Sequence, residues 1–133
     1  MPSANSVVFD ASAVLAVLNK ERGHEKVISS LPGGLISAVN YSEVLKKSIE
    51  NGTLLAEVQH HLQNFMLVVV PFDAEQARRA AEIWPAVRAL GLSFADRACL
   101  TLGLTRGATV LTGDKDMAET QLPVRVKLIR DRR

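Results

Sequence analysis

The side chains of this chain that could act together chemically are four carboxylates: Asp10, Glu43, Asp96 and Asp114. Asp10 directly follows the apolar run 7–9, and Asp114 follows the apolar run 108–112 across a single glycine. If both runs form parallel strands, their carboxyl ends meet at one edge of a sheet, where open α/β folds bind their ligands. The other two carboxylates stand near the starts of expected helices. We therefore expect the four acids to converge.

A cluster of carboxylates at one sheet edge predicts a bound cation. Two carboxylates ~4 Å apart repel each other by about 4 kcal/mol at an effective dielectric constant near ~20. Such a cluster is stable only when a positive ion lies within it, and hard oxygen ligands suit Mg²⁺ or Mn²⁺. The hydroxyls of Ser12 and Thr112 lie two residues from Asp10 and Asp114, and we expect them to orient these carboxylates.

Each carboxylate also has a purely local explanation, because Asp, Ser and Asn cap helices. The candidate caps are Asp10 or Ser12, Asp114, and two pairs with the spacing of a capping box, Asn40 with Glu43 and Ser93 with Asp96. Taken singly, each cap explains its residue at least as well as a metal site does. Four caps do not explain why two acids follow buried strands, whereas convergence on one ion does.

The elements that must position these side chains alternate along the sequence. Short apolar runs bounded by turn residues predict strands at 7–9, 35–37, 66–70, 109–112 and 125–129. Helical spacing predicts helices at 12–20, 24–31, 40–51, 54–65, 73–90 and 93–106, with Pro85 kinking or splitting the fifth. This alternation predicts one domain over residues 1–133, a three-layer α/β/α sandwich with a mainly parallel central sheet.

Composition sets broad limits on the function. With 47% hydrophobic and 23% charged residues, and no apolar run of roughly 20 residues, the chain reads as a soluble globular protein that does not enter a membrane. The single Cys99 and the lack of a signal-peptide pattern favour a cytoplasmic location. A net charge of +2 permits an anionic partner without indicating one. The basic carboxyl end, 125–133, is typical of an edge strand guarded by Lys and Arg.

Other chemistries find little support in the sequence. His60 and His61 are adjacent, so on a helix they point apart and cannot share a metal ion. Cys99 lies in an apolar helical pattern, which predicts an unreactive core thiol. Trp84 and the four Phe residues are expected in the core, because they do not cluster with basic residues as base-stacking aromatics do.

Four segments, in this order, resemble the PIN-domain ribonucleases and, among them, the VapC-like toxins of toxin-antitoxin pairs. The segments are VVFDAS at 7–12, ISAVNYSEV at 36–44, LSFADRA at 92–98 and VLTGD at 110–114. By position, the four carboxylates match the acidic quartet of that family, and Ser12 and Thr112 match its polar supporting positions. Met117 departs from the pattern, since an aromatic residue is common there, and Asp116 adds a nearby acid as a further supporting candidate.

The resemblance implies a PIN-like fold and an endoribonuclease that depends on Mg²⁺ or Mn²⁺. The metal would bind Asp10, Asp96 and Asp114, while Glu43 would position the attacking water or a second ion. Arg97 and Lys115 would offset the charge of the RNA phosphate. The substrate would be RNA, with tRNA among the candidates. The resemblance further implies a homodimer that is held inactive by a cognate antitoxin, a segment of which covers the acidic pocket.

Three alternatives stay open from the sequence. The first is a catalytically inert PIN-like module that only binds proteins, and the second is a housekeeping PIN nuclease. The third is a phosphotransferase of the haloacid dehalogenase type, which also has an Asp after its first strand. That class needs a second acid two residues later, where this chain has Ser12.

Overall fold

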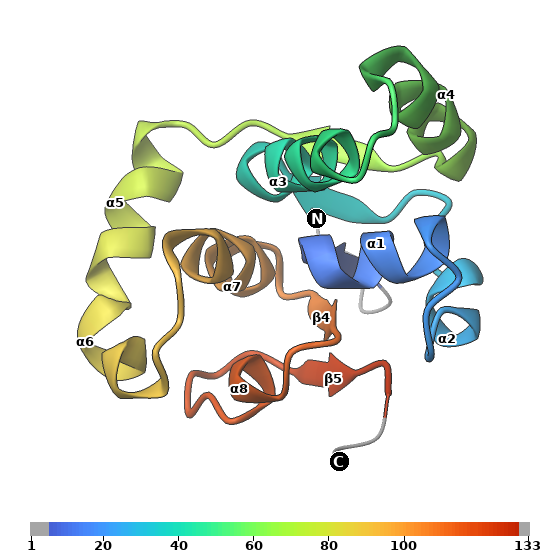
Figure 1. Ribbon diagram of the computed structural model, residues 1–133. Coiled ribbons are helices and arrows are strands. Elements are labelled where there is room, and N and C mark those ends of the chain that lie inside the picture. Colours follow the sequence, from blue (N-terminus) through green and yellow to red (C-terminus); the bar gives the residue numbers. More distant parts are fainter. Residues whose placement is uncertain (1–5, 131–133) are drawn as a thin grey trace.

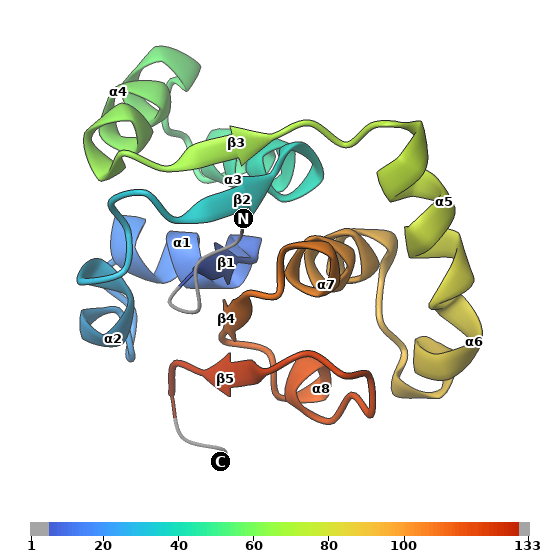
Figure 2. The same cartoon turned by 180° about the vertical axis from the view of Figure 1, so that it is seen from behind.

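The computed structural model describes residues 6–130, which form a parallel five-stranded sheet between two layers of helices (Figures 1 and 2). The strands are β1 (Val7–Phe9), β2 (Leu35–Ser37), β3 (Val68–Val70), β4 (Thr109–Thr112) and β5 (Val126–Leu128). Their order is β3-β2-β1-β4-β5, and every neighbouring pair is parallel. The predicted three-layer α/β/α sandwich is confirmed.

The helices lie close to their predicted positions. They are α1 (Ala11–Leu18), α2 (Glu25–Ile28), α3 (Ala38–Glu50), α4 (Leu55–Phe65), α5 (Ala74–Glu82), α6 (Trp84–Val87), the 3₁₀ turn η1 (Arg88–Leu90), α7 (Phe94–Arg106) and α8 (Lys115–Ala118). The predicted helix 73–90 is split between α5 and α6, because Pro85 lacks an N–H group and fits only the first turn of a new helix. None of the helices within residues 6–130 is both long and apolar enough to cross a bilayer.

Alternate residues of the central strands fill two separate cores. Phe9 and Leu111 point to the face covered by α1 and α3, whereas Val8 and Val110 point to the face covered by α7. Helix α7 is buried along the run 98–103, which includes Cys99, and it contacts β1, β2 and β4. The central position predicted for this helix is therefore confirmed.

Two aromatic residues that were predicted in the core lie at the surface instead. Trp84 is 47% exposed and Phe94 is 50% exposed. Trp84 begins the new helix α6, so the break before Pro85 takes it off the buried face of α5, and the Arg88 guanidinium lies 5.3 Å from its ring centre. Phe94 begins α7 and packs edge-on against Phe72, with the ring centres 5.4 Å apart.

The register of β1 with β4 determines where the acidic residues lie. Phe9 is opposite Leu111 in this parallel pair, so the residues that follow the two strands emerge next to each other. Strand β1 also pairs with β2 on its other side, which makes its carboxyl end the point where the chain connections diverge to either side of the sheet. Such a switch point is the usual ligand-binding position of an open parallel sheet.

An acidic site at the carboxyl edge of the sheet

Asp10 is the buried centre of this site, with 4% of its surface exposed. It caps α1, because its Oδ1 accepts a hydrogen bond of 2.9 Å from the Ala13 N–H group. The Ser12 hydroxyl donates to the same oxygen at 2.7 Å, and the Thr112 hydroxyl donates to the other oxygen. The two carboxylate oxygens are thus held by donors from two elements, the first turn of α1 and the end of β4.

The same two hydroxyls connect the loop after β4 to Asp10 at the start of α1. Ser12 Oγ accepts a hydrogen bond of 2.8 Å from the Gly113 N–H group, and Thr112 Oγ1 accepts one of 3.0 Å from the Asp114 N–H group. Each hydroxyl therefore donates to Asp10 and accepts from the backbone of the loop after β4. This network fixes the backbone of Asp114 relative to Asp10.

Asp114 and Asp96 both cap helices while facing this edge. Asp114 caps α8, accepting a hydrogen bond of 2.9 Å from the Asp116 N–H group. Asp96 forms a capping box with Ser93 at the start of α7, since its Oδ2 accepts from the Ser93 N–H group at 2.9 Å. Its Oδ1 has no protein partner within residues 6–130. The local explanation and the proposed convergence are therefore compatible for these acids.

Glu43 does not belong to a capping box. Helix α3 begins at Ala38 and is capped by Ser37, so Glu43 lies beyond the first turn and the local explanation from its spacing to Asn40 is wrong. The side chain is about one third exposed and lies 3.8 Å from Lys47 Nζ. It is thus a carboxylate of the helix surface rather than a cap.

The charges of three of the four acids affect the buried thiol of Cys99. Burial raises its pKa well above the usual value, and the charges of Asp10, Asp96 and Glu43 raise that pKa further. The three carboxylates therefore lie within electrostatic range of this thiol. The thiol is protonated and enclosed, as expected for an unreactive core residue.

The pKa of Asp10 is raised to about 6, first by burial and in addition by the charge of Asp96. The hydrogen bonds from Thr112, Ser12 and Ala13 oppose this rise, because they stabilise the ionised carboxylate. Asp10 therefore carries a negative charge at neutral pH, although no cationic side chain pairs with it within residues 6–130. A positive ion at this position would lower the energy of the folded state.

The donor set suits a hard divalent cation. Within the described range 6–130, no three carboxylate, imidazole or thiol side chains lie close enough together to hold one ion alone. Mg²⁺ commonly binds one or two carboxylates directly and completes its six ligands with water. Asp10 with Asp96 provides such carboxylates from two elements, and the assignment of three direct ligands stays a prediction.

The structure also places the remaining predicted residues. Asp116 and Lys115 are exposed in the first turn of α8. Arg97 turns toward α5, where its Nη1 donates to the Ala80 carbonyl at 2.9 Å. Its guanidinium also lies 5.7 Å from the centre of the Phe94 ring. A role of Arg97 or Lys115 in holding RNA stays a prediction.

Asn40 joins two of the helices that carry the acids, whereas the sequence indicated only a helix cap at this position. It is 1% exposed, and its side-chain amide donates to the Ala95 carbonyl at 3.0 Å. This contact joins α3, which carries Glu43, to the first turn of α7, which carries Asp96. The available signal was a lone Asn one helical turn before Glu43.

With this geometry established, comparison with known proteins gives the family. The family model of the PIN domain matches residues 7–122, which include all four acids. The chain belongs to the PIN domain family. The resemblance found in the sequence is thereby confirmed. A search of curated protein sequences gave no match.

Several solved structures similar to this PIN domain are described as toxin-antitoxin complexes or as toxins. A toxin-antitoxin complex from Klebsiella pneumoniae gives a TM-score of 0.77 at 14% identity, covering 96% of this chain and 100% of that chain. DNA-bound VapBC from Salmonella typhimurium gives 0.73 at 17% identity, covering 95% and 99%. VapC20 from Mycobacterium tuberculosis, described as a Sarcin-Ricin loop cleaving toxin, gives 0.72 at 18% identity, covering 90% and 99%. At these identities, the similarity shows a shared fold.

Proposed function

We propose that this PIN domain is an endoribonuclease that depends on Mg²⁺ or Mn²⁺ and acts as the toxin of a toxin-antitoxin pair. The observation that carries the proposal is the buried Asp10 carboxylate, which two hydroxyls hold and whose pKa the charge of Asp96 helps to raise. A fold does not maintain uncompensated acids at a sheet switch point for stability, since their repulsion opposes folding. Perturbed carboxylates at such a position are typical of active sites.

Asp10, Asp96 and Asp114 would hold the ion. When bound, it supplies positive charge to the phosphodiester oxygen and lowers the pKa of a coordinated water. Ser12 and Thr112 keep the two oxygens of Asp10 in a fixed orientation. Glu43, on a separate helix and accessible to solvent, would orient the attacking water and accept its proton. Arg97 and Lys115 are the candidates to contact the RNA phosphates.

An antitoxin protein is the proposed partner, and a homodimer is the proposed assembly. The support for the antitoxin is that several similar structures are described as toxin-antitoxin or VapBC complexes. An antitoxin segment that covers the acidic edge would block access of RNA to Asp10. A cytoplasmic location follows from this proposal, since the RNA substrate and the antitoxin are made there.

The test is digestion of total cellular RNA, including tRNA, by the antitoxin-free protein with Mg²⁺, with Mn²⁺ and with a chelator. Asp96→Asn removes one acid of the site, and Asp73→Asn is the matched control, because Asp73 also caps a helix through its carboxylate. We expect discrete products that require metal, are lost in Asp96→Asn and persist in Asp73→Asn.

Two outcomes would contradict the proposal. Products that are unchanged by Asp96→Asn would show that a contaminating nuclease cleaves the RNA. An absence of products from every RNA, together with no change in thermal unfolding on adding Mn²⁺, would favour the alternative of an inert protein-binding module.

A further inference from the structure

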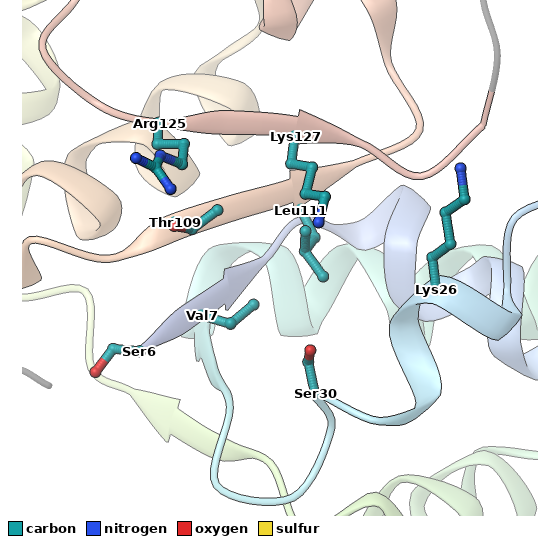
Figure 3. A pocket seen from close by; sticks show the side chains of 8 residues that line it. All are labelled: Ser6, Val7, Lys26, Ser30, Thr109, Leu111, Arg125 and Lys127. Atoms are coloured by element: carbon teal, nitrogen blue, oxygen red, sulfur yellow. The ribbon is translucent and has the colours of Figure 1, made fainter. Parts of the chain in front are cut away.

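A cavity of about 250 Å³ opens at the edge of the sheet opposite to the acidic site (Figure 3). Its floor includes Val7 and Leu111, and Val7 is the first residue of β1. From the amino ends of β1 and β4 the lining extends along one face of the sheet to Leu111 and Lys127, which are opposite each other. None of the described residues of the acidic site lines the cavity, so the two sites are distinct, although β1 and β4 contribute to both.

Three cationic side chains line this cavity: Lys26 from α2, Arg125 just before β5, and Lys127 within β5. No acidic side chain lines it within the described range. None of the three cations forms an ion pair or a hydrogen bond with a described protein group, whereas Lys46 pairs with Glu50 at 3.0 Å elsewhere on the surface. Like charges brought together without a counter-ion repel one another, so this cavity favours an anion.

Hydroxyl groups complete the polar lining. Ser30 and Thr109 both face the cavity, and neither hydroxyl has a protein partner within residues 6–130. Figure 3 shows Ser30 and Lys127 extending toward the same space from opposite sides. Hydroxyl donors together with Lys and Arg are the groups that bind phosphate oxygens by charge-assisted hydrogen bonds.

Protection of an edge strand explains these charges only in part. Arg125 and Lys127 belong to or flank the edge strand β5, where cations prevent pairing with another sheet. That explanation does not account for Lys26, which comes from a helix and lines the same cavity. The convergence of cations from two separate elements is a property of a binding site.

We propose that this cavity binds a phosphate group. The phosphate is carried either by an RNA strand or by a small phosphorylated molecule. The RNA source rests on the proposed function. The Arg130 guanidinium lies against Gly113, between Thr112 and Asp114, and also pairs with Glu21 at 3.5 Å. An RNA strand that runs from the cavity to the acidic edge would pass this side chain.

The first arm of the test measures RNA binding without cleavage. Lys127→Glu and Arg125→Glu are each compared with Arg88→Glu, an exposed arginine outside the cavity with the same change of charge. All three are made in the Asp96→Asn chain with chelator present, and fluorescence anisotropy gives the affinity for RNA at several salt concentrations. We expect the cavity variants to bind more weakly, with a log–log salt slope shallower by about 0.7 per lost contact on single-stranded RNA.

The second arm titrates inorganic phosphate and a mononucleotide into the intact chain by calorimetry. Binding that is lost in Lys127→Glu and kept in Arg88→Glu supports the site with a small-molecule source, even if RNA affinity is unchanged. Equal effects of the cavity variants and Arg88→Glu in both arms would overturn the proposal. Neither arm depends on cleavage. The binding results can therefore be interpreted even if the protein has no nuclease activity.

Discussion

The two edges of one small sheet carry opposite charges and are built in opposite ways. At the carboxyl edge, Asp10 is buried and accepts hydrogen bonds from Ala13, Ser12 and Thr112. At the cavity that begins at the amino ends of β1 and β4, here called the amino edge, Lys127 and the other two cations are exposed and pair with no described protein group. The same strands, β1 and β4, present both edges.

This difference follows from what burial does to charge. A buried carboxylate loses its hydration, so it persists only where fixed donors replace the water. An exposed cation keeps its water and needs no such network. The carboxyl edge is consequently rigid and specific in geometry, whereas the amino edge can adapt to a ligand that brings its own charge. Four predictions test this contrast, from the largest expected effect to the smallest.

The largest effect is expected from neutralising Asp10. Its pKa in the folded state is about 6, above the usual 3.8, so the folded state holds this proton more tightly than the unfolded state does. The stability contributed by this group is complete below pH ~4 and is lost as the pH rises through ~6, by about 3 kcal/mol at about 1.36 kcal/mol per pKa unit. In Asp10→Asn this loss is absent.

The measurement is urea unfolding of the intact chain, Asp10→Asn and Asp73→Asn at several values between pH 4 and pH 8. We expect the free energy of unfolding of Asp10→Asn, relative to the intact chain, to increase between about pH 4 and the folded-state pKa of about 6 and to level off above it. Asp73→Asn removes an exposed capping carboxylate and serves as the control for general charge effects. If the free energies of unfolding of the intact chain and of Asp10→Asn changed in parallel with pH, burial would not raise the pKa of Asp10.

A smaller effect is expected from removing one hydroxyl of the network. Thr112→Val deletes the donor to Asp10 and the acceptor of the Asp114 N–H group. We expect a loss of about 2 kcal/mol near pH 8, because hydrogen bonds to charged groups contribute ~1.5–3 kcal/mol. The loss should shrink near pH 5, where Asp10 is largely protonated.

Thr101→Val is the matched control for this substitution. Thr101 is 1% exposed, like the fully buried Thr112, but its hydroxyl has no hydrogen-bond partner among the described residues. Replacing an unpartnered buried hydroxyl by a methyl group is expected to be neutral or stabilising. Equal losses in the two valine variants would show that Thr112 acts through packing alone.

Much of the fold could be predicted from the sequence, because buried apolar runs have few alternatives. The strands 7–9, 35–37 and 109–112 lie at the predicted residues, since each apolar run is bounded by turn-forming or polar residues. The exposed Trp84 was mispredicted, because the helical phase was continued through a break at Ile83. A local break shifts every later residue to another face.

The acidic site was easier to predict than the rest of the polar surface. Asp10 is found by its place directly after a strand, and parallel topology then brings it to the same edge as Asp114. No comparable rule links Lys26 to Arg125, because only the packing of a helix turn near β5 brings them to one cavity. The contact of Asn40 with Ala95 likewise depends on how α3 and α7 pack.

Metal binding should distinguish the two edges, because we expect Mn²⁺ to bind at the acidic edge. If free Mn²⁺ exceeds its dissociation constant tenfold, the folded state gains about 1.4 kcal/mol. We expect this gain as a rise in thermal midpoint for the intact chain and for Asp73→Asn, and a much smaller rise for Asp10→Asn. Measurement by calorimetry at constant ionic strength removes general salt effects. An equal rise in all three proteins would place the ion away from the acidic edge.

The smallest effect is expected at the amino edge. Lys127→Glu puts a carboxylate between Lys26 and Arg125 and so relieves the repulsion among three like charges. The effect is small because all three side chains are exposed to solvent. We expect the free energy of unfolding to rise by no more than about 0.5 kcal/mol. The gain should vanish in 1 M salt, where the screening length falls to ~3 Å. A loss well above 1 kcal/mol that persists in salt would instead show that the Lys127 side chain packs as part of the fold, and the amino edge would then be as tightly built as the acidic one.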